Sequence, residues 1–287
     1  MEKDKSLKKI LIVSFEAGSA EIISELFSNR NKSLVFKINQ ITKKIFSSKG
    51  FKILEYGKKN YKFDSIFFGA SYNHGEIKFL KNKKFDNTVK NCVLDHWVYY
   101  KHRINIKNKF LINNFYVFDR FAKKKLEKLK IKKSKILEKK HPILSKLKKL
   151  KSINKGEKKV VIFLNNVSFY KNKKFKGFLS NFELINYAVK HLKFKYKYLS
   201  QIYIKMHPAN NKKKYKKYLK KFHNLKILKT KETLNSLGSS KLVIGNESMV
   251  LYLSYCLKIK NINITKNKKT LIPPIFCSKI LRLKSRR

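Results

Sequence analysis

Short apolar runs that end in polar, turn-forming residues recur along this chain, and they constrain its fold more than any other feature. Two examples are Ile202–Met206, which is followed by His207 and Pro208, and Leu242–Ile244, which is followed by the turn Gly245–Ser248. Short continuous runs of this kind are expected of strands in a sheet that is covered on both faces. Because helical stretches separate the runs, the sequence predicts an α/β fold with a mostly parallel, doubly wound sheet.

The predicted elements form two series with the same rhythm of strand and helix. The predicted strands are Lys8–Phe15, Leu34–Ile38, Lys52–Tyr56, Asp64–Phe68, Thr88–Leu94, Lys109–Phe118, Lys159–Leu164, Tyr203–Met206, Leu225–Leu228, Leu242–Ile244 and Asn261–Ile264. The predicted helices are Ala20–Phe27, Gln40–Phe46, Arg120–Leu129, Phe178–Leu192, Asn211–Phe222, Thr233–Leu237 and Met249–Leu257. We expect Ser19 to cap the first helix, Asp119 to cap the helix that begins at Arg120, and the tail Pro273–Arg287 to cross back over the first series.

The length of 287 residues exceeds that of the usual single domain and favours two domains of about 140 residues each. We predict Rossmann-like domains at residues 1–135 and 158–287. The stretch 136–157 is dense in lysine and contains Pro142 and Gly156, so we interpret it as a basic linker, with a surface helix as the alternative. Two such domains place a cleft between the carboxyl ends of their strands.

The net charge of +54 raises the question of an anionic partner. Only six of the 71 basic residues are arginine, although proteins that read nucleic acids favour the bidentate guanidinium. The lysines are spread along the chain together with many Asn, Ile, Phe and Tyr residues, which is what codon drift in an AT-rich genome produces. The composition argues against a nucleic-acid partner, while an anionic membrane surface or polysaccharide stays open as a partner.

The sequence shows neither a membrane span nor an export signal. The start, Met1–Lys9, is charged, and Ile10–Val13 is too short for the apolar region of a signal peptide. No stretch reaches the ~18 apolar residues of a transmembrane helix. Cys92, Cys256 and Cys277 form no pattern typical of disulfides or metal sites and indicate reduced thiols. We expect a cytoplasmic protein that is soluble or peripheral on the inner face of the membrane.

The pair His207-Pro208 after a strand, with Ser248 opening a helix 41 residues after His207, resembles the C-terminal half of bacterial GT-B glycosyltransferases. It looks most like the sialyltransferase and polysialyltransferase group and the related polyol-phosphate transferases of cell-wall synthesis. The passages Ile12–Ser19 and Asp95-His96-Trp97 look like those of surface-polysaccharide proteins. The resemblance implies that residues 1–135 form the acceptor side and that residues 158–287 bind a nucleotide-sugar.

In those families a His-Pro motif and a later serine motif grip the nucleotide phosphate. The resemblance therefore places the donor site at His207, Pro208, Gly245, Asn246, Glu247 and Ser248. An imidazole at a strand end can hydrogen-bond a phosphate oxygen and, as imidazolium, stabilise the leaving nucleotide. Pro208 fixes the turn, and Ser248 adds its donor to the free amides at the start of a helix. Glu247 is expected either to accept from a ribose hydroxyl or to be an acid placed near a helix N-terminus. The structural alternatives are a turn residue for His207 and a helix cap for Ser248.

Transfer to a sugar hydroxyl also needs a general base on the acceptor side. Glu16 and Asp95 both lie at predicted strand ends, and Glu16 is the favoured of the two, although the acid-acid-glycine pattern of sialyltransferases is missing. His74 and His96 are lesser candidates and are more typical of loop or structural histidines. Trp97 could stack on a sugar ring, but we expect it in the core or at an interface.

Other chemistries lack their motifs in this sequence. There is no phosphate-binding G-x-x-x-x-G-K-[ST] loop, no G-x-G-x-x-G and no G-x-S-x-G elbow. Paired histidines four residues apart and the D-x-D metal motif are also missing. We therefore expect no metal and no cofactor, with the nucleotide-sugar as a co-substrate.

The sequence thus predicts a metal-independent GT-B glycosyltransferase that moves a sugar from a nucleotide-activated donor, CMP-linked donors included, to a cell-surface polysaccharide or lipopolysaccharide. The alternative among enzymes is a nucleotide-sugar 2-epimerase of the same double fold, which normally needs several acids where this chain has 17 in all. Two further alternatives are a basic nucleic-acid-binding protein and an inactive partner in surface assembly.

Overall fold

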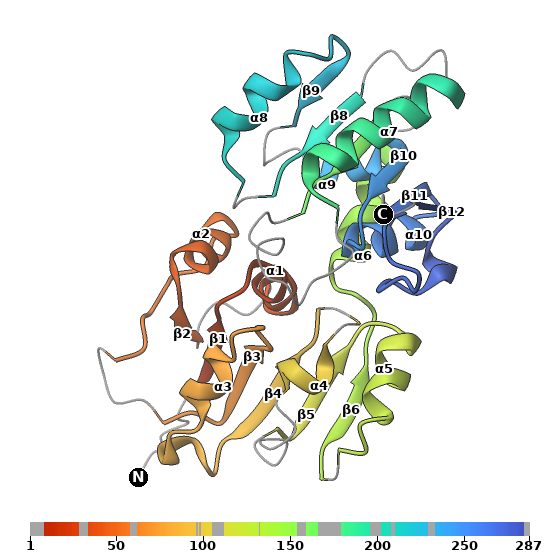
Figure 1. Ribbon diagram of the computed structural model, residues 1–287. Coiled ribbons are helices and arrows are strands. Elements are labelled where there is room, and N and C mark those ends of the chain that lie inside the picture. Colours follow the sequence, from red (N-terminus) through yellow and green to blue (C-terminus); the bar gives the residue numbers. More distant parts are fainter. Residues whose placement is uncertain are drawn as a thin grey trace, which may run out of the picture. The chain divides into compact units, whose positions relative to one another are not determined.

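The structure is a computed structural model in which residues 9–28, 34–57, 62–95, 97, 99–104, 112–131, 133–153, 159–165, 179–195, 202–207, 210–228 and 233–283 are described. The chain divides into two compact units, Met1–Ile143 and Leu144–Arg287. Each unit contains a six-stranded sheet in which all strand pairs are parallel (Figure 1). The predicted parallel, doubly wound α/β architecture is confirmed.

The first unit alternates strands with helices from β1 to β6. Its elements are β1 (Ile10–Ser14), α1 (Ala17–Leu26), β2 (Leu34–Ile38), α2 (Gln40–Ser48), β3 (Ser65–Gly69), α3 (Gly75–Leu80), the 3-10 helix η1 (Lys83–Phe85), β4 (Val89–Val93), α4 (Tyr100–Arg103), β5 (Asn114–Val117), α5 (Arg120–Glu127) and β6 (Lys135–Glu138). The helix α6 (Ile143–Ile153) begins at the last residue of this unit and otherwise belongs to the second. The strand order is β2-β1-β3-β4-β5-β6. Asp119 caps α5 as predicted, because its carboxylate accepts from the amides of Phe121 and Ala122.

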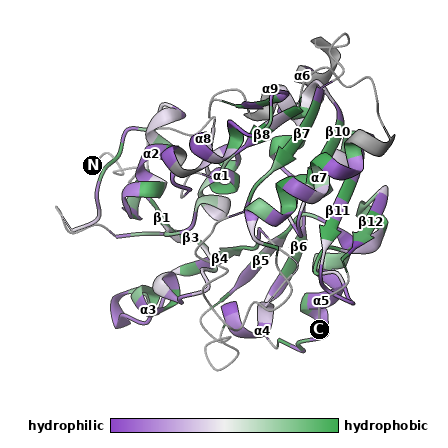
Figure 2. Cartoon of the chain, turned by 45° about the horizontal axis from the view of Figure 1, so that its top comes forward, coloured by the Kyte–Doolittle hydropathy of each residue, from purple (hydrophilic) through white to green (hydrophobic). Residues whose placement is uncertain are grey.

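The second unit repeats the alternation. Its elements are β7 (Lys159–Phe163), α7 (Asn181–Lys195), β8 (Ile202–Lys205), α8 (Lys212–Leu219), β9 (Leu225–Ile227), α9 (Thr233–Gly238), β10 (Ser240–Gly245), α10 (Met249–Cys256), β11 (Lys260–Thr265), the 3-10 helix η6 (Pro274–Phe276) and β12 (Lys279–Arg282). The strand order is β12-β11-β10-β7-β8-β9. Figure 2 shows the central strand β7 as mostly hydrophobic, whereas α7 carries both hydrophobic and hydrophilic residues. Ile185 and Ala188 of α7 pack with Ile204 of β8 in a wholly buried cluster.

The structure differs from the predicted elements in four details. Lys52–Tyr56 forms no strand and contributes only an isolated bridge from Glu55 to Phe36. The tail does not cross to the first series within the described residues, because Lys279–Arg282 is β12 and pairs with β11. The N-cap of α1 is Glu16, and Ser19 lies within the helix, where its hydroxyl donates to the Glu16 carbonyl. The predicted linker 136–157 contains most of β6 and the whole of α6.

Candidate functional site

Each sheet has a point where the strand order reverses, and these two points position the candidate residues. In the first unit β1 lies between β2 and β3, and in the second unit β7 lies between β8 and β10. Helices connected in opposite directions leave a crevice outside the carboxyl ends of the strands at such a point, where open α/β sheets bind their ligands. The residues that follow β1 and β3, and those that follow β7 and β10, are therefore the first places to look for chemistry.

In the second unit, Asn165 joins the two turns that the sequence assigns to nucleotide binding. It follows β7, and its Nδ2 donates to the carbonyl of Asn246 at 2.6 Å. Its own carbonyl accepts from Nδ2 of Asn210 at 3.2 Å, and the amide of Asn210 donates to the carbonyl of His207 at 2.9 Å. Because β7 separates β8 from β10, the two turns are roughly 10 Å apart, twice the spacing of neighbouring strands.

Asn246 anchors the second of these turns from within the core. The residue is completely buried, and its Nδ2 donates to the carbonyl of Ile264 at 2.7 Å. Its Oδ1 accepts from the amide of Leu179 at 3.3 Å and from Nδ2 of Asn165 at 3.4 Å. Both ends of the buried Asn246 side-chain amide are thus bonded within the protein, and its role is to hold the turn in place.

Glu247 and Ser248 complete this turn. Glu247 has a left-handed backbone with φ of 51°, and its Oε2 accepts from the amides of Leu271 and Ile272 at 2.9 and 3.0 Å. Its Oε1 is buried and lacks a hydrogen-bond partner among the described residues, as does Nδ2 of the neighbouring Asn263. Ser248 is the N-cap of α10, with its hydroxyl 3.5 Å from the amide of Val250, so the predicted capping role is present. An acceptor and a donor without partners at a strand end match the hydrogen-bonding groups of a hydroxylated ligand.

His207 lies at the carboxyl end of β8 in an environment that keeps it uncharged. Burial, and then the charge of Lys205, lower the pKa of His207 from 6.5 to about 4. The imidazole of the free protein is therefore neutral at pH 7 and can act as a hydrogen-bond donor or acceptor. The imidazolium expected from the sequence requires a bound anion to raise that pKa. Pro208 lies outside the described residues.

In the first unit, the structure brings Glu16 and Asp95 together through Arg103, a residue that the sequence did not single out. Nη1 of Arg103 lies 3.1 Å from Oε2 of Glu16 and 3.6 Å from Oδ1 of Asp95, and it donates to the carbonyl of Ala70 at 2.8 Å. The Arg103 side chain is 4% exposed and that of Asp95 is 7% exposed, whereas 29% of the Glu16 side chain is accessible. Glu16 is thus the more open of the two predicted bases.

A second buried acid, Glu76, fixes the backbone around this site. It is completely buried, and its carboxylate accepts from the amides of Phe15 at 2.9 Å and Ser71 at 3.2 Å. Burial raises the pKa of Glu76, against the lowering effect of these hydrogen bonds. Glu76 therefore ties the end of β1 to the end of β3, and Oε1 of Glu16 adds a further link by accepting from the amide of Tyr72 at 2.9 Å.

The remaining aromatic candidates divide between core and surface. Trp97 is 4% exposed and donates from Nε1 to Oδ2 of Asp119 at 2.5 Å, in agreement with its expected place in the core. His74 lies at the exposed start of α3, and its Nε2 is 3.2 Å from Nε2 of His102. His96 lies outside the described residues. Within the described part of the chain, no three His, Cys, Asp or Glu side chains are arranged to hold a metal ion, and no helix is long and apolar enough to cross a membrane.

No family model matches the sequence, and no curated protein matches it. Solved structures do match the fold. The UDP-GlcNAc 2-epimerase of Methanocaldococcus jannaschii, in complex with UDP-GlcNAc and UDP, gives a TM-score of 0.67 at 14% identity over 95% of this chain and 88% of that chain. The UDP-GlcNAc 2-epimerase of Neisseria meningitidis, bound to UDP-GlcNAc, gives 0.64 at 13% identity over 93% and 85%.

The wall teichoic acid polymerase TagF, in a variant form, is also similar, with a TM-score of 0.53 at 12% identity over 89% of this chain and 70% of that chain. At identities this low the likeness shows the fold. The chain therefore has the GT-B type of fold, with two Rossmann-like domains, that the resemblance in the sequence predicts. The narrower resemblance to sialyltransferases stays a prediction.

Proposed function

We propose that the protein is a glycosyltransferase that moves a sugar from a nucleotide-activated donor to a cell-surface polysaccharide or lipopolysaccharide without using a metal. One observation carries the proposal. The two turns that the sequence assigns to the nucleotide follow strands on either side of β7, and Asn165 hydrogen-bonds to both sides. A frame of this kind at the reversal point of a parallel sheet is where a nucleotide binds. The likeness in fold to proteins solved with UDP or UDP-GlcNAc agrees with a nucleotide-sugar.

In the donor site, neutral His207 and the N-terminus of α10 bind the phosphates. The first amides of α10 and the helix dipole favour negative charge. Glu247 is the acceptor for a ribose hydroxyl in this proposal, and Oε1 is the oxygen of its carboxylate that has no hydrogen-bond partner among the described residues. Pro208, Gly245, Asn246 and Ser248 shape the two turns. A bound phosphate raises the pKa of His207, so that the imidazole can stabilise the leaving nucleotide.

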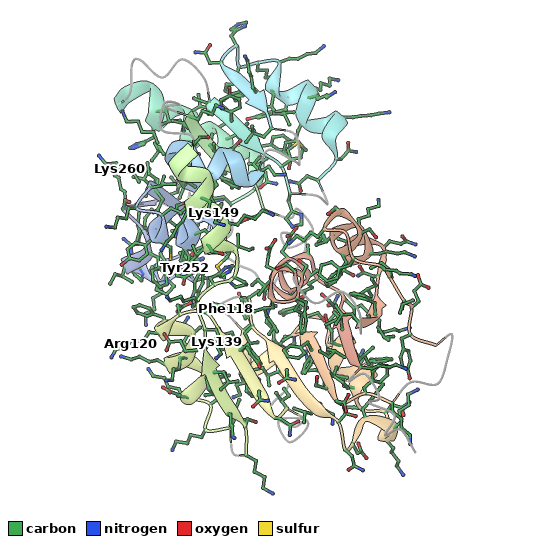
Figure 3. The ribbon with its side chains drawn as sticks, turned by 180° about the vertical axis from the view of Figure 1, so that it is seen from behind. Phe118, Arg120, Lys139, Lys149, Tyr252 and Lys260 are labelled. Carbon is green, nitrogen blue, oxygen red and sulfur yellow. The ribbon has the colours of Figure 1, made fainter. Side chains whose placement is uncertain are left out.

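In the acceptor site, Glu16, Asp95 and Arg103 surround the sugar that receives the transfer. Two carboxylates and one guanidinium leave this site with a formal charge of −1, so it favours hydroxyl-rich groups over acidic ones. The lysine-rich surface, in turn, holds the enzyme near the anionic inner leaflet, where lipid-linked acceptors are found. Arg120, Lys139 and Lys260 are three of its exposed cations (Figure 3).

A thermal-shift screen tests the donor site. CMP, CDP, UDP, GDP and ADP are added to wild type, to His207→Ala and to His223→Ala, a control at an exposed histidine after α8. A nucleotide at 100 times its Kd stabilises by roughly 2.7 kcal/mol. We expect the nucleotide with one particular nucleobase to stabilise the wild type and the His223→Ala control selectively. The same nucleotide should stabilise the His207→Ala variant far less. Equal thermal shifts with every polyanion, lost in moderate salt, contradict the proposal and favour a basic binding protein instead.

The likeness to two UDP-GlcNAc 2-epimerases makes a 2-epimerase the second candidate function. The two activities differ in their products. A transferase releases UDP only as sugar is transferred or hydrolysed, whereas an epimerase establishes an equilibrium between two UDP-sugars. Incubation with UDP-GlcNAc, followed by NMR of the anomeric protons, separates them: a second UDP-sugar without loss of the first to free UDP identifies the epimerase.

A further inference from the structure

Two histidines from different helices meet at the carboxyl edge of the first sheet. Nε2 of His74, the residue before α3, is 3.2 Å from Nε2 of His102 in α4. Nε2 of His102 is also 3.1 Å from the carbonyl oxygen of Tyr72, and the His102 ring packs on the Tyr72 ring at a centroid distance of 4.3 Å. Because the amide of Tyr72 donates to Glu16, this pair lies directly beside the acceptor site.

The contacts fix where the protons are. A carbonyl oxygen only accepts, so the proton of neutral His102 is on Nε2, where it points toward Tyr72. His74 must then accept through its own Nε2, which places its proton on Nδ1. This leaves the lone pair of His102 on Nδ1, and no hydrogen bond to Nδ1 occurs within the described residues. A backbone carbonyl that holds one imidazole nitrogen as a donor leaves the other as a base.

Two further properties support a chemical role for the pair. His74 has a left-handed backbone with φ of 58°, and Tyr99, which precedes α4, has φ of 61°. Such conformations are strained for residues other than glycine and gather at functional sites. Burial, the charge of His102 and that of Lys78 lower the pKa of His74, which keeps it neutral and able to accept. The ionisable groups nearby are Lys78, whose charge acts on His74, and Glu16, which accepts from the Tyr72 amide and pairs with Arg103.

The predicted bases are, by contrast, already engaged. Both oxygens of Glu16 have partners, since Oε1 accepts from Tyr72 and Oε2 pairs with Arg103. Asp95 is 5% exposed and its Oδ2 packs so closely on Gly18 that a methyl group there would clash. His102 is exposed, with its free nitrogen on the same edge of the sheet.

We propose that His102 is the proton acceptor of the transfer reaction, with Tyr72 and His74 as the groups that hold it. This inference rests on the proposed glycosyltransferase function. The acceptor hydroxyl gives its proton to Nδ1 of His102 while its oxygen bonds to the anomeric carbon of the donor. The bond from that carbon to the nucleotide phosphate breaks, and its electron pair leaves with the phosphate. The imidazolium is stabilised by the Tyr72 carbonyl and the His74 lone pair and later loses its proton to water.

The test compares His102→Gln with Glu16→Gln, His74→Gln, His74→Leu and the control His223→Gln. Nucleotide release is measured from UDP-GlcNAc, GDP-mannose and CMP-N-acetylneuraminate with octyl glucoside and octyl galactoside as acceptors, and the nucleotide-induced thermal shift is measured beside it. We expect His102→Gln to lose ~100-fold or more in rate, as for a general base, with an unchanged thermal shift. His74→Gln retains an acceptor oxygen for His102 and keeps most of the rate, whereas His74→Leu does not.

The pH profile separates a base from a structural residue. The wild-type rate falls toward acid pH, as expected of a reaction that depends on a general base, and the residual rate of His102→Gln lacks this decline. A full rate in His102→Gln, or loss of the acid decline in Glu16→Gln alone, overturns the assignment of His102. If the wild type releases nucleotide from none of the three donors, the proposed function fails and the assignment with it.

Discussion

Replacement of Asn246 by alanine tests the frame that holds the candidate donor site. The side chain is completely buried and forms hydrogen bonds with Ile264, Leu179 and Asn165. Its removal leaves the Ile264 carbonyl and the Leu179 amide without this partner inside the protein. A buried polar group that loses its partner costs about 1–3 kcal/mol, so the two together lower the free energy of unfolding by ~3 kcal/mol. In a protein of 287 residues that corresponds to a fall in Tm of roughly 5 °C.

The assay is urea unfolding followed by circular dichroism, with nucleotide binding measured on the same samples. Asn224→Ala is the matched control, because Asn224 is exposed and its side chain makes no hydrogen bond within the described residues. We expect the control to lie within about 0.5 kcal/mol of the wild type. Asn246→Asp keeps the shape but places an acceptor against the Ile264 carbonyl, so it should be at least as unstable as the alanine variant.

Two results would refute this reasoning. An Asn246→Ala variant as stable as Asn224→Ala would show that the buried hydrogen bonds contribute nothing to the second unit. An Asn246→Ala variant that is destabilised but binds nucleotide with the wild-type affinity would show that the turn does not depend on this frame. Either outcome would remove the link between Asn165 and the proposed donor site.

Three further substitutions test the packing and charge of the candidate sites. Gly18→Ala places a methyl carbon 2.1 Å from Oδ2 of Asp95, so it should lower the free energy of unfolding by about 1–3 kcal/mol. Helix propensity alone predicts the opposite, a gain in stability. The loss should vanish when Asp95 is also replaced by alanine. Burial raises the pKa of Glu76 above its ordinary value of 4.5, so in this pH range the folded state binds more protons than the unfolded state, and stability falls as the pH rises. The urea midpoint of Glu76→Gln should lack this slope, and a slope equal to that of the wild type would contradict the assignment. The pKa of His207 is lowered to about 4, so the unfolded state takes up the proton first and the free energy of unfolding falls by about 3 kcal/mol as the pH drops from 6.5 to 4. His207→Gln should lose this part of the acid sensitivity. An equal change in the urea midpoints of wild type and His207→Gln between pH 7.5 and pH 4.5 would contradict this prediction.

Most strands could be predicted from the sequence, but two of the four edge strands, β6 and β12, could not. The predicted strands contain an apolar run, as Leu242–Ile244 does within β10, and a buried run of this kind is visible in the sequence. Both β6 and β12 lie at sheet edges, and each shows the same pattern of exposed ends with partly buried middle residues. Their lysine-rich ends make them look like a linker and a tail. Lys52–Tyr56, which contains Ile53 and Leu54, is predicted as a strand but supplies only one bridge.

The candidate sites divide in the same way. Glu16, Asp95 and His207 follow predicted strands, so the sequence could place them at the carboxyl ends of those strands. Their partners come from far along the chain: Arg103 is 87 residues from Glu16, and Asn165 is 81 residues from Asn246. Neither partner belongs to a motif. Such pairings follow from the strand order, which cannot be read from a single sequence. Arg103 is one of only six arginines in the chain, and this rarity is a signal that could have identified it as a candidate.

Salt dependence decides whether the lysine field or the described site binds the nucleotide. The groups proposed to contact the phosphates are neutral His207 and the amides at the start of α10, and short contacts of this kind are screened little by salt. Between 50 and 500 mM salt we therefore expect nucleotide affinity to fall less than about tenfold, whereas heparin, held by many lysines at once, should lose several orders of magnitude. A parallel fall for nucleotide and heparin would mean that the charge of +54, and not the site at the reversal point of the second sheet, binds the nucleotide.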